Sequence, residues 1–273
     1  MKIGIQGTIG SFHYEAAKNI FGTKHEFVEC MDFNEIPILL KQNKIGKGVM
    51  AIENTIAGAI LPNYSLIDEY DLHVCGEHYL PIQHHLMALP KQNIQDIKEV
   101  WSHPMALLQC RKFFRKHPYI KLVEEKDTAE MAKIIQQKQL KGIAAIAGYE
   151  AAKIYRLEMI AKSIQTNQIN ATRFVVLDKN NGQSKQDFNK ASIRFKLSHE
   201  AGSLVGILRI FNDYKLNMSK IQSLPIVDKP WEYAFFVDLL IEDQETYQIA
   251  MYKVAQKVLE LKILGEYKSG RKM

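Results

Sequence analysis

Residues 2–30 read KIGIQGTIGSFHYEAAKNIFGTKHEFVEC. The apolar runs at both ends of this segment predict strands. Between them, Phe12, Ala16 and Ile20 recur at a four-residue step, which predicts a helix over residues 11–21. The order strand, helix, strand is typical of a layered α/β domain.

The same alternation continues to residue 178. Helices are predicted at 33–42, 105–117 and 127–138, and strands at 47–53, 77–89, 99–103, 120–126, 142–148, 158–164 and 172–178. We expect the long strand at 77–89 to leave a first lobe, and the last two strands to return to it. Two lobes joined by crossing strands form a hinge and a cleft, where small ligands bind. The sequence therefore predicts a two-lobed α/β domain over 1–178, with a second lobe at about 79–157.

A polar segment follows this domain. Residues 178–190 read DKNNGQSKQDFNK, in which only Phe188 is large and apolar, and this composition predicts a linker at 179–189. The remaining residues, 190–273, show the order strand, helix, strand, strand, helix, strand. That βαββαβ order predicts a ferredoxin-like second domain.

Composition narrows the class of protein. The 273 residues are 47% hydrophobic and 24% charged, with 36 basic and 30 acidic residues and a net charge of +6. The lysines are scattered, so we expect a small anionic ligand and no nucleic acid. There is no run of about 18 apolar residues and no signal-peptide pattern, so we expect a cytoplasmic protein. Cys30, Cys75 and Cys110 are widely spaced and are predicted to be reduced, buried thiols.

Polar residues beside predicted strand ends are the candidate site. Ser11 begins a helix whose free N–H groups suit a carboxylate, although a plain turn explains it equally well. The glycine pattern before Ser11 lacks the Lys-Ser/Thr of a P-loop, so no nucleotide site is predicted. Glu53, Asn54 and Thr55 follow a buried strand, where open α/β sheets bind ligands; a helix N-cap is the alternative.

A second polar group lies further along the chain. Thr172 can donate a hydroxyl hydrogen bond, and Arg173 can clamp a carboxylate; an exposed strand end is the alternative. Ser102 and Gln109 flank a strand-to-helix junction, which alone is a weak signal.

Three histidines raise the question of a metal. His78, His84 and His85 lie close in sequence, but His84 and His85 are adjacent on a predicted strand and point to opposite faces. Without a spaced Asp or Cys partner, packed or hydrogen-bonded histidines are favoured, and we predict no metal site.

Several motifs occur together in one order. They are IENTIAG at 52–58, SHPMALLQC at 102–110, DTAEMAK at 127–133, AAIAGYEAAKIY at 144–155 and N-x-TRFVVL at 170–177. In this order they resemble the prephenate dehydratase family along nearly the whole first domain, and the second domain resembles the ACT domain that follows in that family. The resemblance implies a two-lobed fold similar to periplasmic binding proteins. It also implies conversion of prephenate to phenylpyruvate with loss of water and CO2, no cofactor, and feedback inhibition by L-phenylalanine at the ACT domain.

The resemblance also assigns residues. Carried over by motif, the catalytic residues are Thr172, Glu53, Asn54, Thr55, Ser102 and Gln109, and the substrate-binding residues are Arg173, Phe174 and Ser11. The threonine is the residue most closely tied to catalysis in the family. We expect Thr172 to hydrogen-bond the departing hydroxyl, Arg173 to hold a carboxylate, and Glu53 to serve as a proton source only if it is buried.

The regulatory motifs depart from the family pattern. The family's G-A-L-V reads Gly202, Ser203, Leu204, Val205, and its E-S-R-P reads Gln222, Ser223, Leu224, Pro225. The charged pair is lost, which predicts altered phenylalanine binding with catalysis unaffected. In the first loop, His13 replaces a small polar residue.

The sequence also predicts the assembly of the protein. Edge strands of βαββαβ units pair between subunits, so we expect a homodimer or homotetramer. The chain begins at the first catalytic strand, so we expect a monofunctional enzyme without a fused chorismate mutase. Arogenate dehydratase and a non-catalytic small-molecule sensor stay open as alternatives.

Overall fold

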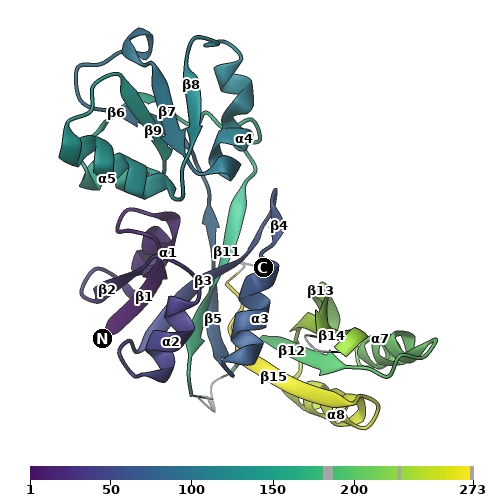
Figure 1. Cartoon of the computed structure of the whole chain (residues 1–273). Coiled ribbons are helices and arrows are strands. Elements are labelled where there is room, and N and C mark those ends of the chain that lie inside the picture. Colours follow the sequence, from purple (N-terminus) through teal and green to yellow (C-terminus); the bar gives the residue numbers. More distant parts are fainter. Residues whose placement is uncertain (181–186, 227–228, 271–273) are drawn as a thin grey trace. The chain divides into compact units, whose positions relative to one another are not determined.

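The computed structural model describes residues 1–180, 187–226 and 229–270. The chain forms two compact units, one of residues 1–60 and 78–174 and one of residues 61–77 and 175–273. Figure 1 shows the helices and strands of both units, which include three sheets among the described residues. Residues 181–186 of the predicted linker lie outside the described residues.

The first sheet has the strand order β2-β1-β3-β11-β5, with the short β4 beside β3. Its strands are β1 (Lys2–Gln6), β2 (Glu26–Cys30), β3 (Lys47–Asn54), β4 (Gly58–Ala59), β5 (His73–Pro81) and β11 (Ala171–Asp178). Strand β1 runs parallel to β2 and β3, so helices α1 (Phe12–Phe21) and α2 (Glu35–Lys41) serve as crossovers. Buried Ile3, Ile5 and Val49 pack with Ala16 and Ala17 of α1.

The second sheet has the order β10-β6-β9-β7-β8. Its elements are β6 (His85–Ala88), η1 (Ile94–Asp96), β7 (Glu99–Ser102), α4 (Pro104–Phe114), β8 (Lys121–Glu124), α5 (Thr128–Lys138), β9 (Ile143–Ala147), α6 (Tyr149–Ile154) and β10 (Glu158–Ala161). Ala144 and Ile146 join a core cluster with α4, whereas Ala145 and Ala147 join a cluster with α5. Because alternate strand residues face opposite sides, helices cover both faces of this sheet.

Two predictions about the strands between the lobes were wrong. The predicted strand at 77–89 is broken, since β5 ends at Pro81 and β6 begins at His85. At the break, Ile82 N donates to the Asn170 carbonyl oxygen, 2.8 Å away, so the backbone bonds to another segment. The predicted strand at 158–164 was expected to return to the first lobe, but β10 pairs antiparallel with β6 in the second sheet.

Two α-helices of the described residues were not predicted. Residues 61–69 form helix α3 (Leu61–Glu69), with Pro62 in its first turn and buried residues that include Tyr64 and Ile67. The short α6 was also missed. The second helix of the predicted βαββαβ order is α8 (Gln244–Ala255), which ends before strand β15 begins at Glu260.

The third sheet is antiparallel, with the order β13-β14-β12-β15. Its elements are β12 (Lys190–Lys196), α7 (Ser203–Asp213), β13 (Asn217–Ile226), β14 (Lys229–Leu240), α8 and β15 (Glu260–Tyr267). Ile193 and Phe195 of β12 pack with Phe211 of α7 and Tyr247 of α8, so both helices cover one face of the sheet. This arrangement is the predicted ferredoxin-like unit.

The other face of the third sheet is polar and contacts residues 61–77. Arg194 Nε lies 3.0 Å from Asp68 Oδ2, and Lys190 Nζ lies 2.9 Å from Glu77 Oε2. A side chain at Gly265 would meet the Val74 carbonyl oxygen at 1.9 Å, so this close approach requires glycine. These contacts explain why residues 61–77 group with the C-terminal residues in one unit.

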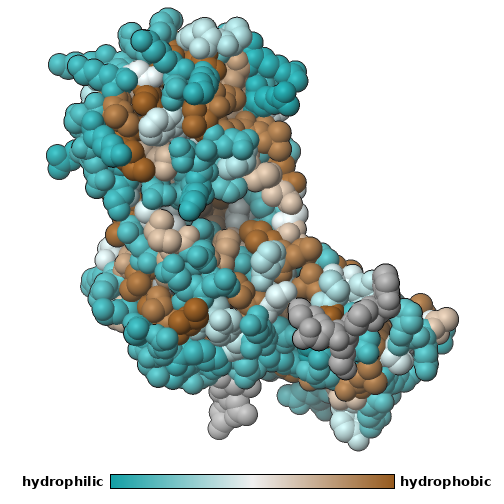
Figure 2. Space-filling view, in the orientation of Figure 1, coloured by the Kyte–Doolittle hydropathy of each residue, from teal (hydrophilic) through white to brown (hydrophobic). Residues whose placement is uncertain are grey.

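The two lobes of the first unit touch at one side. Lys18 Nζ of α1 lies 2.7 Å from Glu150 Oε2 of α6, and the Tyr155 hydroxyl donates to the Ile9 carbonyl oxygen. Gly10 adopts a φ of +94°, which suits glycine in the loop that meets Ala151. Figure 2 shows a hollow between the two lobes.

Two smaller predictions can be compared with the structure. Cys30 and Cys110 are buried as predicted, but Cys75 is exposed, so the prediction was wrong for that thiol. Burial raises the pKa of the Cys30 thiol to about 11 and that of Cys110 to about 12. In the described part of the chain, no helix has the length and apolar character needed to cross a membrane.

Candidate active site

Asn54 is the centre of the candidate site, at the carboxyl end of strand β3. Its Oδ1 accepts hydrogen bonds from the backbone N–H groups of Ile56 and Ala57, both at 2.9 Å. This turn, which an Asn side chain readily makes, fixes the orientation of the side-chain amide. The Asn54 NH2 group is therefore directed away from its own turn.

The Asn54 NH2 group points to strand β11. Nδ2 lies 2.9 Å from Thr172 Oγ1 and 2.8 Å from Asn170 Oδ1. Because the Thr172 oxygen accepts this bond, its own hydrogen is available for donation, and the hydroxyl makes no other hydrogen bond to the described residues. Thr172 is buried at 8% exposure. The structure thus orients a hydroxyl donor.

Gln109 of helix α4 extends this network to the second lobe. Its Oε1 accepts from Asn170 Nδ2 at 3.0 Å and lies 2.9 Å from His84 Nε2. The hydrogen-bonded side chains therefore run from Thr172 through Asn54, Asn170 and Gln109 to His84. Such a connected network holds each member in one geometry.

Glu53 and Arg173 form an ion pair beside this network. Arg173 Nη1 lies 3.7 Å from Glu53 Oε2, and the Arg173 side chain is 3% exposed while that of Glu53 is 38% exposed. The burial that proton donation by Glu53 would require is therefore not present. Arg173 thus carries a permanent, buried positive charge one residue after Thr172 on strand β11.

Three other predicted residues have their polar groups engaged elsewhere or lie in the core. The Ser11 hydroxyl caps helix α1, accepting from Tyr14 N at 3.2 Å. The Ser102 hydroxyl donates to the Ile146 carbonyl oxygen at 2.7 Å and the residue is fully buried. Phe174 is 1% exposed and belongs to the core of the first sheet. The structure does not bring these three side chains into the network.

Thr55 links the end of strand β3 to the start of strand β11. Its Oγ1 accepts from Ala171 N at 3.0 Å, and its N–H donates to the Ala171 carbonyl oxygen at 2.9 Å. These two bonds tie the end of β3 to the start of β11. They keep Asn54 and Thr172 side by side.

His13 of helix α1 contacts strands β3 and β11. Its ring contacts Phe174 edge-on, with centroids 4.9 Å apart, and its Nε2 accepts from Ala51 N at 3.3 Å. Burial lowers the pKa of His13 to about 3, so the ring is neutral. The departure from the family pattern at this position thus places a neutral acceptor in the core.

This burial predicts acid sensitivity. Unfolded His13 has an ordinary pKa near 6.5, so the unfolded chain binds more protons below that pH and stability is lost as pH falls from 6.5 towards 3. The test variant is His13→Gln, whose amide oxygen can still accept from Ala51 N. Between pH 7 and pH 5 we expect the free energy of unfolding to fall by about 2 kcal/mol more in the wild type than in His13→Gln. Urea unfolding at both pH values measures this; equal losses in both proteins would contradict it.

Two residues of the network were missed as functional residues. His84 and His85 do point to different partners, because His85 Nδ1 accepts from Ser163 N at 3.1 Å. His84 was considered only as a metal ligand or a packed residue, and Asn170 only as part of a motif. The sequence could have indicated Asn170, because it lies two residues before Thr172, next to the start of the same strand.

Comparison with known proteins identifies the family. The family described as Prephenate dehydratase matches residues 3–182. The chain belongs to the prephenate dehydratase family. This match confirms the predicted family and enzyme class. The matched residues include Asn54, Gln109 and Thr172.

Relatives and solved structures agree with the assignment to the prephenate dehydratase family. The chain is 32% identical to the bifunctional chorismate mutase/prephenate dehydratase of Aquifex aeolicus, over 98% of this chain and 73% of that protein. It is 33% identical to arogenate dehydratase/prephenate dehydratase 2, chloroplastic, of Arabidopsis thaliana, over 98% of this chain and 72% of that protein. A crystal structure of prephenate dehydratase from Arthrobacter aurescens in complex with L-Phe superposes with a TM-score of 0.89 at 22% identity, covering 99% of this chain and 90% of that chain. The predicted fold class is thereby confirmed.

Proposed function

We propose that this chain converts prephenate to phenylpyruvate, and that the side chains around Asn54, Gln109 and Thr172 form the catalytic site. The observation that carries the proposal is the Asn54 Nδ2 to Thr172 Oγ1 bond of 2.9 Å, which directs the threonine hydrogen outward. A hydroxyl donor held in this way suits a substrate that must lose a hydroxyl group.

The reaction assigns a role to each group. The bond between the ring and its carboxylate breaks to release CO2, and its electron pair forms the new ring double bond as the ring becomes aromatic. The carbon–oxygen bond at the far ring carbon breaks, and the hydroxyl leaves with one added proton as water. Thr172 donates a hydrogen bond to that departing hydroxyl and relays to it a proton supplied by the solvent, because a threonine hydroxyl is too weak an acid to be the final source.

Arg173 and Glu53 position the substrate. We assign the buried Arg173 guanidinium to holding a substrate carboxylate, since its charge is permanent and Glu53 fixes its place at 3.7 Å. Thr55 braces the two strands, and Ser11, Ser102 and Phe174 support the backbone around the site.

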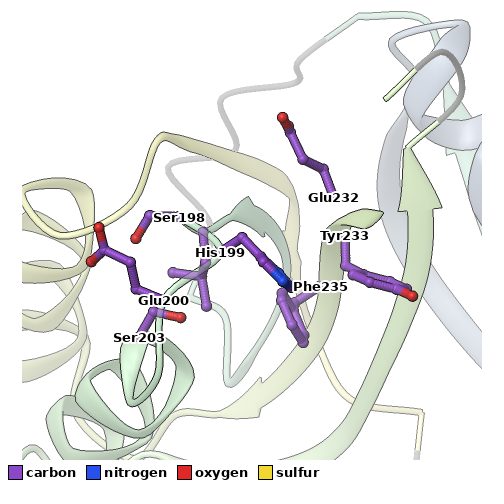
Figure 3. Close-up of a pocket in the computed structure, with 8 residues that line it drawn as sticks. Ser198, His199, Glu200, Ser203, Glu232, Tyr233 and Phe235 are labelled. Carbon is purple, nitrogen blue, oxygen red and sulfur yellow. The ribbon is translucent and has the colours of Figure 1, made fainter. Parts of the chain in front are cut away.

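Regulation by L-phenylalanine belongs to the same proposal. A cavity of about 100 Å³ lies at the start of helix α7 (Figure 3), lined by Leu197, Ser198, His199, Glu200, Ser203, Glu232, Tyr233 and Phe235. Ser203 is the one predicted regulatory residue that lines it, whereas Gln222 to Pro225 lie on the edge strand β13. The cavity is smaller than the roughly 300 Å³ of typical ligand sites. We therefore propose that a second copy of the chain completes an effector site, in a homodimer or homotetramer.

The domain boundaries and location stay part of the proposal. We assign residues 1–178 to catalysis, 179–189 to a linker and 190–273 to regulation, which the match over 3–182 supports for the first boundary. The cytoplasmic location stays a prediction.

One assay tests the function. Purified protein is given prephenate or arogenate, with and without millimolar L-phenylalanine, and phenylpyruvate or phenylalanine is measured. We expect phenylpyruvate from prephenate, and slower turnover when phenylalanine is present. If only arogenate were turned over, arogenate and not prephenate would be the substrate. If the folded protein turned over neither compound, the proposal that it is an enzyme would be contradicted.

A further inference from the structure

His84 has a fixed position at the break between β5 and β6. Its N–H donates to Gln165 Oε1 at 3.0 Å, and its carbonyl oxygen accepts from Ile164 N at 2.9 Å. The ring is buried with 4% exposure and meets the Phe12 ring edge-on at a centroid distance of 5.6 Å. Backbone and ring therefore hold Nε2 where it faces Gln109 Oε1, 2.9 Å away.

The surroundings of the ring fix its tautomer. Nδ1 is buried and has no hydrogen-bond partner among the described residues. A proton on Nδ1 would leave a buried donor unpaired, which costs about 1–3 kcal/mol. Burial also lowers the pKa of His84 to about 4, which keeps the ring neutral. The single proton thus lies on Nε2, and His84 donates to Gln109.

This donation and the one from Asn170 Nδ2 together decide which way the Gln109 amide points. Gln109 Oε1 accepts from both His84 Nε2 and Asn170 Nδ2, at 2.9 and 3.0 Å. A flipped amide would place its NH2 group against two donors, and both bonds would be lost. In the observed orientation, the half-buried Gln109 NH2 group makes no hydrogen bond to the described residues.

We propose that His84 is a positioning residue of this enzyme, which holds the Gln109 amide so that its NH2 group donates to a carboxylate or hydroxyl oxygen of the substrate. The proposal rests on the proposed function for the choice of substrate. His84 itself does not touch the substrate; it acts through Gln109. The hydrogen bonds that orient the Gln109 amide are already present without substrate.

Two substitutions at His84 separate hydrogen bonding from packing. His84→Gln carries an N–H group the same number of bonds from Cα as Nε2, but it loses the ring that packs on Phe12. His84→Phe keeps an aromatic ring there but has no donor. We expect kcat/KM for prephenate to fall about tenfold to a hundredfold in His84→Phe and clearly less in His84→Gln. If only packing mattered, the order of the two variants would be reversed, and that result would overturn the proposal.

A double-mutant cycle and a matched control make the test specific. In a Gln109→Met background the His84→Phe substitution should cost less than twofold further, because His84 would have no amide to orient. An undiminished loss would overturn the proposal. The control is His85→Asn, which retains an acceptor for Ser163 N and should keep wild-type turnover.

A second readout does not depend on activity or on the folding of the variants. Nitrogen-15 NMR of histidine in the wild-type protein at pH 7 reports which ring nitrogen carries the proton. We expect His84 to be neutral with its proton on Nε2. A proton on Nδ1, or a doubly protonated ring, would overturn the proposal. Failure of the proposed function would instead appear as a wild type that turns over neither prephenate nor arogenate, with the tautomer unchanged.

Discussion

Thr172→Ala should lower kcat for prephenate by about 100- to 10,000-fold, the range found when a positioned proton donor is removed. The reason is that Asn54 Nδ2 donates to Thr172 Oγ1, which leaves the threonine hydrogen to donate to the departing hydroxyl in the proposed reaction. KM should change little, because the lost interaction strengthens only as the hydroxyl departs. Steady-state kinetics of phenylpyruvate formation measures both parameters.

Two variants are matched controls for this result. Thr172→Ser keeps the hydroxyl and should retain most of kcat. Arg173→Lys keeps the charge but loses the planar fork of donors, so it should raise KM more than it lowers kcat. Wild-type kcat in Thr172→Ala would refute the assigned role of the hydroxyl. A loss as large in Thr172→Ser would show that strand packing is responsible.

The strand ends of the candidate site could be predicted from sequence because they depend on local pattern. A buried run followed by polar residues placed Asn54 at the end of one strand, and a polar run before an apolar one placed Thr172 at the start of another. That these two strands, β3 and β11, are neighbours came from the structure. His84 could not be recognised in the same way. Its partner Gln109 is 25 residues away on a helix of the second lobe, and the break at 82–84 that turns the ring depends on bonds to Gln165 and Asn170.

For the serine hydroxyls, the sequence predicted a site role that their hydrogen bonds in the structure do not support. Ser11 and Ser102 match the family motif, yet one caps a helix and the other bonds to a carbonyl oxygen of strand β9. A sequence shows that a hydroxyl is present but not which backbone group it meets. Helix α3 was missed for a related reason, since its buried Tyr64 packs against Phe236 of the third sheet, a contact that the sequence does not reveal.

The polar face of the third sheet holds the largest expected effect on stability. The side chains of Lys190 and Glu77 are 1% and 0% exposed, and Nζ lies 2.9 and 3.1 Å from the two carboxylate oxygens. Removing one member of a buried pair leaves the other charge buried, at a cost of about 3–5 kcal/mol. We therefore expect Lys190→Met to lower the free energy of unfolding by that amount, measured by urea denaturation followed by circular dichroism.

A second substitution should restore most of this loss. In Lys190→Met with Glu77→Gln no charge stays buried, and the amide oxygen can still accept from Gly270 N, which donates to Glu77 Oε1 at 3.0 Å. The exposed pair of Lys268 and Asp187, with side chains 58% and 83% exposed, is the control. Lys268→Met should change stability by less than about 1 kcal/mol. A Lys190→Met variant no less stable than Lys268→Met would contradict this prediction, since an ionised carboxylate kept from water does not tolerate the loss of its cation.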